Sequence, residues 1–267
     1  IQQAGPAAQG ITNDKIILAT STAMTGANKE LGTNMVMEMQ ACFKSINEAG
    51  GISGRQIELV VKDDGYEPDQ ALENMHTLFE KDKVFAVIGN VGTPTAQATV
   101  PYANENQYLF FAPFTGAQSL RRDPPDRYVF NLRASYADET AAMVNYFVEK
   151  KNIAPEKIAV FAQNDSFGDD GFAGVAKALE KYKIQPENIF RFGYERNTTQ
   201  IADAVKQIEQ NQDRIEALIM VATYKPAALM VQKLKDNNLN IRTAAVSFVG
   251  SELLAQQFKE MGPQYAE

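Results

Sequence analysis

The chain has 267 residues but only one cysteine, Cys42, one histidine, His76, and no tryptophan. A lone cysteine cannot form an internal disulfide, and a lone histidine cannot supply a His-rich metal site. The patterns GxSxG, SxxK and HExxH are also absent, which removes the usual sequence anchors of hydrolytic catalysis. Cys42 falls inside an amphipathic helix, where we expect a buried structural thiol. His76 falls beside the apolar face of another helix, where we expect a flanking or surface side chain.

Positive charge is also scarce. Lys and Arg number 26 against 33 Asp and Glu, which gives a net charge of −7, and no basic cluster is interleaved with aromatic residues. We therefore expect no nucleic-acid partner. No apolar run approaches the roughly 18 residues of a transmembrane helix. The 45% of hydrophobic and 22% of charged residues fit a folded globular chain.

Short apolar runs alternate along the chain with helix-length amphipathic segments. This alternation is typical of parallel strands joined by crossover helices, so we predict an α/β fold. At about 150 residues per domain, the length suits about two domains, and the proline- and charge-rich stretch Arg121–Arg127 is the expected border. The predicted strands are Lys15–Thr20, Gln56–Lys62, Phe85–Gly89, Tyr108–Phe111, Tyr128–Leu132, Lys157–Ala162, Ile189–Tyr194, Ala217–Val221 and Thr243–Phe248.

Loops that follow the strands are the places to search for a ligand, because helix N-termini there present free N–H groups and a positive dipole end. Three such loops are rich in small and hydroxyl residues and suit a carboxylate or another small polar group: Ser21–Gly32, Gly89–Thr95 and Ala112–Gly116. In the second loop we predict Thr93 as the N-cap of a helix, with Pro94 at the first helical position. Capping alone explains Thr93, and it does not exclude ligand binding. The glycine spacing matches no dinucleotide or phosphate pattern, so we expect no nucleotide.

Two acidic groups raise the alternatives of metal ligands or a general acid–base pair: Asp63-Asp64 and Asn164–Asp170. The second lacks the glutamate at position 12 of a calcium loop. Helix-dipole compensation and solvation explain both groups more simply, so we expect no metal and no cofactor.

Four aromatic residues lie at or just past the ends of predicted strands: Phe114, Phe167, Tyr224 and Phe248. Aromatic walls with a few hydroxyls make a small-molecule pocket. Each residue alone also fits a core position, so both interpretations stay open.

Several longer motifs resemble one family, the type I periplasmic substrate-binding proteins of ABC importers, in their branched-chain amino acid (Leu/Ile/Val) receptor group. The motifs are MTGANKELG (24–32), INEAGGISGRQIELVVKDDGYEPDQA (46–71), VFAVIGNVGTPTAQATVPYANE (84–105), FAPFTGAQSLR (111–121), YVFNLRASYADE (128–139), FAQNDSFGDDG (161–171) and ATYKPAALMVQKLKDNNL (222–239). The resemblance runs from about Gly10 to the end of the chain.

This resemblance implies two doubly wound parallel-sheet lobes joined by a hinge, an N-terminal lobe over 11–129 and a second, incomplete lobe over 130–267. The lobes close on a small solute, which is then delivered to an ABC permease in the inner membrane. The implied location is the periplasm, and Ile1–Gly10 reads as an uncharged leader, either the remainder after signal-peptide cleavage or an arbitrary start. About a hundred further residues would complete such a receptor. Enzymatic turnover is not expected.

The family's carboxylate site can be carried over only where motifs match. Thr93 lies where the receptors use a serine on the ligand carboxylate. Phe114 and Gly116 occupy the positions of a small residue and a threonine of that site, so one hydroxyl is lost, although Thr115 is adjacent. Cysteines that disulfide-bearing members carry near Gly65 and Gly92 are absent.

In the second lobe, Phe167 and Tyr224 match aromatic positions of the family's ligand site. The largest departure is Phe248, which stands at or near the glutamate that binds the ligand ammonium group, and the nearest acid in the sequence is Glu252. A buried ammonium without a counter-charge is costly, so we expect a carboxylate with an apolar or aromatic body.

Two other functions fit the same scaffold. A ligand-sensing ectodomain of a signalling receptor shares the fold and the closure. An enzyme is the third class, and loss of turnover in Cys42→Ser or His76→Ala would reveal it.

Overall fold

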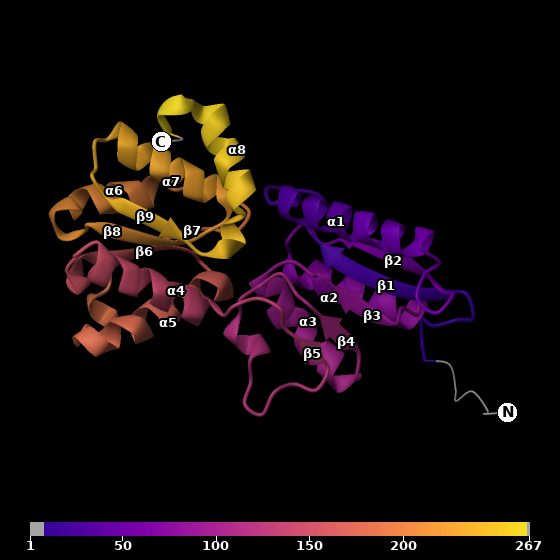
Figure 1. Cartoon of the computed structure of the whole chain (residues 1–267). Coiled ribbons are helices and arrows are strands. Elements are labelled where there is room, and N and C mark those ends of the chain that lie inside the picture. Colours follow the sequence, from indigo (N-terminus) through magenta and orange to yellow (C-terminus); the bar gives the residue numbers. More distant parts are fainter. Residues whose placement is uncertain (1–7, 266–267) are drawn as a thin grey trace. The chain divides into compact units, whose positions relative to one another are not determined.

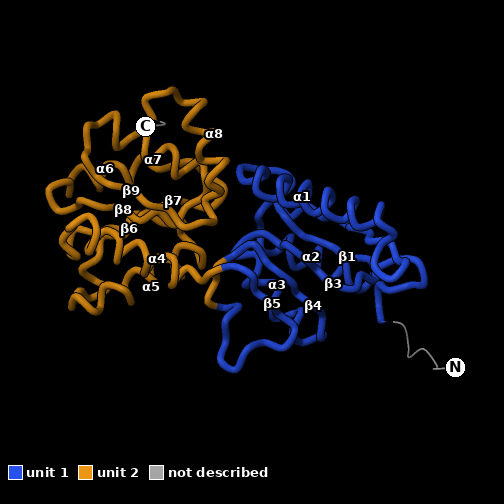
Figure 2. The backbone as a smooth tube through the Cα atoms, viewed as in Figure 1, with its two compact units in different colours: residues 1–115, 119–133 blue, residues 116–118, 134–267 orange. Residues whose placement is uncertain are grey.

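The computed structural model describes residues 8–265, so most of the predicted leader lies outside the described residues. The chain divides into two compact units, coloured separately in Figure 2. Lobe 1 runs to Thr115 and resumes over Ser119–Arg133, whereas lobe 2 takes Gly116–Gln118 and everything from Ala134 onward. The proline-rich stretch expected at the border belongs to lobe 1.

Lobe 1 is built on five parallel strands in the order β2-β1-β3-β4-β5. Its elements are β1 (Lys15–Thr22), α1 (Lys29–Glu48), β2 (Gln56–Asp63), α2 (Pro68–His76), β3 (Ala86–Ile88), α3 (Thr93–Glu105), β4 (Leu109–Phe111) and β5 (Val129–Phe130). The order reverses between β1 and β3, and right-handed crossovers therefore place α1 on one face and α2 with α3 on the other (Figure 1). This is a doubly wound sheet, whose ligand loops leave the carboxyl ends of the strands.

Lobe 2 repeats the plan with four parallel strands in the order β7-β6-β8-β9. Its elements are α4 (Tyr136–Asn145), β6 (Ile158–Gln163), α5 (Ser166–Leu179), β7 (Arg191–Tyr194), α6 (Ala202–Gln210), β8 (Ala217–Val221), α7 (Tyr224–Asp236), β9 (Arg242–Ala245) and α8 (Ser251–Met261). Every residue of β6 and β8 is buried, as expected for central strands covered on both faces. The predicted α/β fold with two doubly wound sheets is therefore confirmed.

Two local expectations were wrong. The predicted strand Thr243–Phe248 ends at Ala245, and Phe248 instead lies in a short helical turn, Ser247–Val249. Cys42 is exposed, because the inward positions of α1 fall to residues such as Val36 and Met39. Cys42 lies six positions after Val36, about 120° away around the helix, which turns the thiol outward.

Candidate functional site

Two loops at the carboxyl ends of β3 and β4 lie side by side in lobe 1. Val91 and Phe114 form an isolated parallel bridge. The Gly92 amide donates to the Phe114 carbonyl at 3.2 Å, and the Phe114 amide donates to the Asn90 carbonyl at 2.8 Å. These backbone bonds fix the two loops relative to each other.

The loop pair brings Thr93 and Thr115 together. Their Oγ1 atoms lie 2.7 Å apart, and both side chains are buried. The structure corrects the predicted cap, because Gly92 is the N-cap and Thr93 the first residue of α3. Gly92 has a φ of +114°, a value that suits glycine alone, and the Thr93 hydroxyl is thereby aimed at Thr115. We call Thr93, Phe114 and Thr115 the lobe-1 site.

A cation also faces this site. The guanidinium carbon of Arg133 lies 4.1 Å from the centre of the Phe114 ring, within the range of a cation–π contact. Helix α3 adds the positive end of its dipole at Thr93. Two hydroxyls, a helix amino end and a nearby guanidinium form a chemical environment that suits a carboxylate. Sequence reasoning missed Arg133, since no local pattern pairs it with Phe114.

Three aromatic rings gather in lobe 2, at Tyr136, Phe167 and Phe248, and we call them the lobe-2 aromatic cluster. Phe167 lies 4.8 Å from Phe248 and 5.2 Å from Tyr136, measured between ring centres, and none is more than 1% exposed. Gly116 belongs to the same place, because a Cβ added to it would lie 2.8 Å from the Tyr136 ring. Sequence reasoning did not single out Tyr136 as a site residue.

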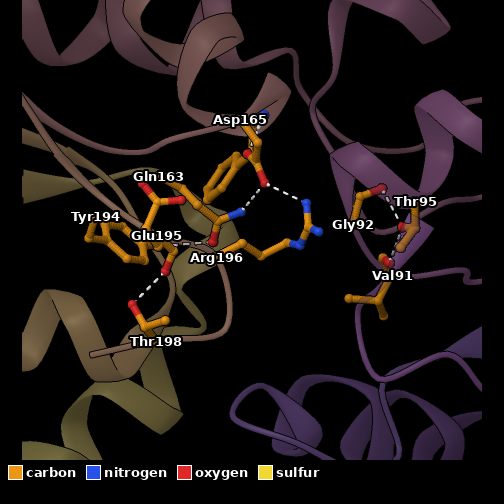
Figure 3. Close-up of polar contacts among 10 residues, drawn as sticks. Val91, Gly92, Thr95, Gln163, Asp165, Tyr194, Glu195, Arg196 and Thr198 are labelled. Carbon is orange, nitrogen blue, oxygen red and sulfur yellow. Dashed lines mark hydrogen bonds and ion pairs between the residues drawn. The ribbon is translucent and has the colours of Figure 1, made fainter. Parts of the chain in front are cut away.

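Tyr224 occupies the first residue of α7 and is buried. The residue before it is held by a buried network. The amide of Thr223 donates to the Tyr194 hydroxyl at 3.1 Å. That hydroxyl donates to Gln163 Oε1 at 3.1 Å, and both of these side chains are drawn in Figure 3. Burial is the largest cause that raises the pKa of Tyr194 above its ordinary value. Tyr194 is thus a neutral hydroxyl that links the carboxyl ends of three strands.

The same network reaches the start of α5. Gln163 Nε2 donates to Asp165 Oδ2 at 2.7 Å, and Arg196 Nη1 lies 3.3 Å from that oxygen. Asp165 is the N-cap of α5 and accepts from the Phe167 amide at 3.0 Å. Helix capping therefore accounts for Asp165, and it also orients Phe167.

The acidic turn after β2 departs from the solvated surface expected of it. Asp64 is only 2% exposed; it accepts from the Ser21 hydroxyl at 2.7 Å and the Tyr66 amide at 2.9 Å. Burial raises the pKa of Asp64 to about 6 despite these bonds. Asp63 is exposed and shifts the other way: burial raises its pKa, but bonds from Thr25, Gly65 and Met24 together lower it below the ordinary value.

An acid that the sequence did not indicate contacts the turn that carries Phe248. Glu252 is exposed at the start of α8. Glu139 of α4 instead accepts from the amide of Ser247 at 2.6 Å and from its hydroxyl at 2.8 Å. A carboxylate from a distant helix therefore anchors the turn that carries Phe248.

His76 occupies an ordinary position in the structure. His76 is half-exposed, as expected, and its Nδ1 lies 2.8 Å from Glu80. Among residues 8–265, no group of three or more His, Cys, Asp or Glu side chains could hold a metal ion. In the same range, no helix combines the length and the apolarity needed to cross a membrane.

The family model described as "Periplasmic binding protein" matches residues 15–267. An "Amino acid binding protein" of Pseudomonas aeruginosa is 25% identical over 253 residues, covering 94% of this chain and 65% of its own length. The crystal structure of a possible leucine/isoleucine/valine-binding protein from Rhodopirellula baltica is 39% identical, with a TM-score of 0.87, and covers 96% of this chain and 67% of that one.

A solute-binding protein of an ABC transporter from R. palustris, solved with benzoate, shares the fold at 19% identity and a TM-score of 0.78. The match covers 88% of this chain and 63% of that chain. This chain thus spans about two thirds of the length of these relatives.

Proposed function

The chain belongs to the periplasmic binding protein family, and from this membership we propose that it is part of the solute-binding receptor of an ABC importer. It captures a small carboxylate-bearing solute in the periplasm by closure of its two lobes and delivers it to a permease of the inner membrane. The observation that carries the proposal is the buried pair of hydroxyls, Thr93 and Thr115, at the amino end of α3.

The carboxylate belongs at the lobe-1 site. Carboxylates are stabilised where hydroxyl donors and free N–H groups meet the positive end of a helix dipole. Thr93 supplies both a hydroxyl and an amide of the first turn, and Thr115 supplies a second hydroxyl. Arg133, stacked on Phe114, adds positive charge to the site.

The body of the solute is apolar or aromatic. Phe167, Tyr224 and Phe248 are buried aromatic residues near the carboxyl ends of the lobe-2 strands, and Gly116 leaves room for the Tyr136 ring. The position expected to hold an ammonium group carries Phe248, and the adjacent carboxylate of Glu139 is already bonded to Ser247. These features favour an aromatic or aliphatic acid over an α-amino acid, and binding without turnover.

A calorimetric comparison of isoleucine, benzoate and decanoate tests the proposal. We expect benzoate or decanoate to bind and isoleucine to bind at least tenfold more weakly. Tight binding of isoleucine would contradict the assignment of Phe248, and failure of all three would contradict the carboxylate class.

Two matched threonines locate the site. Thr93→Val removes a lobe-1 site hydroxyl, whereas Thr99→Val removes a buried hydroxyl of the same helix that donates only to the Thr95 carbonyl, at 2.9 Å. We expect Thr93→Val to weaken binding about tenfold or more, by loss of a charge-assisted hydrogen bond. Thr99→Val should leave the affinity within about twofold. Equal effects would refute the placement of the carboxylate.

A further inference from the structure

Tyr66 lies in lobe 1, within the family motif over 46–71 but outside the three loops that were expected to bind a ligand. It is 1% exposed and has a φ of +64°, a left-handed conformation that is unusual for a bulky residue. The Asp64 carboxylate accepts from its amide at 2.9 Å, and Asp64 is itself fixed to β1 by Ser21. A strained residue held in place by a buried carboxylate is a sign of function.

The ring of Tyr66 packs directly on Gly92. A Cβ added to Gly92 would lie 2.3 Å from Tyr66 Cε2 and 2.7 Å from Thr95 Oγ1. The Tyr66 ring and the Thr95 hydroxyl therefore both lie where a side chain of residue 92 would stand. Thr95 in turn donates to the carbonyls of Val91 and Gly92 at 2.6 and 3.1 Å (Figure 3). No side chain larger than that of glycine fits this position.

We propose that Tyr66 is a positioning residue of the lobe-1 site, whose ring holds Gly92 so that Thr93 meets Thr115 and the first amides of α3 stay oriented. That the site binds a carboxylate rests on the proposed function, whereas the contact between Tyr66 and Gly92 is observed in the structure. Asp64 and Ser21 extend the support from β1 and β2 to the loop after β3. Residues at the ends of three strands thereby help to position the hydroxyls of Thr93 and Thr115.

Amide hydrogen exchange tests this positioning without any ligand. The amides to follow are those of Gly92, Phe114 and Ala96, which bond to Phe114, Asn90 and Gly92 carbonyls. In Tyr66→Ala we expect their exchange to accelerate at least about tenfold relative to amides of β1, because the loop pair opens locally. Tyr66→Phe keeps the ring, so the three amides should exchange at the wild-type rates. Unchanged rates in Tyr66→Ala would overturn the proposal.

A matched control separates positioning from general loss of packing. Tyr108 lies just before β4, at the other end of the sheet, and stacks on Phe79 at 3.8 Å. Tyr108→Ala should lower the melting temperature but leave exchange at the three amides unchanged. If Tyr66→Ala does not fold, Tyr66→Leu replaces it, because leucine fills volume without a flat ring.

Affinity links the inference to the ligand. For whichever of isoleucine, benzoate and decanoate binds the wild type, we expect Tyr66→Ala to weaken binding at least tenfold, and Tyr66→Phe and Tyr108→Ala to stay within about threefold. Equal losses in Tyr66→Ala and Tyr108→Ala would refute positioning. If none of the three binds the wild type, the proposed function fails for these acids, and the exchange rates alone decide the role of Tyr66.

Discussion

The hydroxyls of Thr93 and Thr115 lie 2.7 Å apart in the interior of lobe 1, although the two residues follow different strands. Each hydroxyl satisfies part of the hydrogen-bonding capacity of the other. A buried polar group that loses its partner costs more free energy than a pair that is removed together. The pair is therefore coupled energetically as well as in space.

We predict that Thr93→Val and Thr115→Val each lower the free energy of unfolding by about 1–3 kcal/mol. The double variant should lose less than the sum of the two, by about 0.5 kcal/mol or more, because no orphaned hydroxyl remains. Urea unfolding of the four proteins measures the coupling. Strict additivity would mean that the two hydroxyls do not interact.

We predict that Asp64 makes the protein less stable as the pH rises. Its pKa is about 6 in the folded chain and near the ordinary value of 3.8 in the unfolded chain, so the folded state binds more protons between about pH 4 and pH 6. The free energy of unfolding should fall over that range by up to about 3 kcal/mol from this group. The difference in stability between wild type and Asp64→Asn, measured at several pH values, isolates the effect.

Asp63 provides a control of opposite sign. Its pKa is lowered in the folded state, so its contribution to stability is present above the ordinary pKa and is lost as the pH falls through the folded value. The difference between wild type and Asp63→Asn should therefore grow with rising pH over the acid range. The same sign for both variants would show that the buried environment of Asp64 has been misassigned.

We predict that Tyr194→Phe destabilises lobe 2 by about 1–3 kcal/mol, because the amide of Thr223 and Oε1 of Gln163 both lose a buried partner. Tyr146, whose side chain is exposed, supplies the matched control. Tyr146→Phe should change the free energy of unfolding by less than about 0.5 kcal/mol. Guanidinium unfolding of both variants makes the comparison. Similar changes in the free energy of unfolding would mean that the hydrogen bonds of Tyr194 do not stabilise lobe 2.

We predict that the thiol of Cys42 reacts with a water-soluble disulfide reagent in the native protein, without denaturant, because the residue is exposed. Cys42→Ser should leave the free energy of unfolding within about 0.5 kcal/mol of wild type. If the thiol reacts only after unfolding, Cys42 is buried, as expected from the sequence.

The order of strands and helices could be predicted because it depends on short-range pattern. The run Ala217–Val221, for example, is wholly buried, and its apolar sequence predicted the strand with the same bounds. The run Thr243–Phe248 was also predicted as a strand, yet β9 ends at Ala245, because Glu139, 108 positions away, bonds Ser247 and turns the chain out of the sheet. Periodicity carries no information about such a distant partner.

The candidate site was harder to predict from the sequence, because it also depends on contacts between residues that are distant in the sequence. Thr93 was found because a Thr-Pro pair at a strand end is a local signal, although it placed the cap one residue too late. Tyr66 follows an Asp-Gly pair that reads as an ordinary turn. Its importance depends on Gly92, which the fold brings against its ring, and only three-dimensional packing reveals that contact.

Gly116 belongs to a short segment of lobe 2 that lies, in the sequence, between two segments of lobe 1. Residues 116–118 belong to lobe 2 but are encoded inside lobe 1, and the Gly116 carbonyl accepts from the amide of Tyr136 at 2.9 Å. A chimaera joined at residue 134 would transplant the Tyr136 ring without the glycine that packs against it. The lobes therefore cannot be exchanged between relatives by a single junction. A chimaera must transfer residues 116–118 together with the rest of lobe 2.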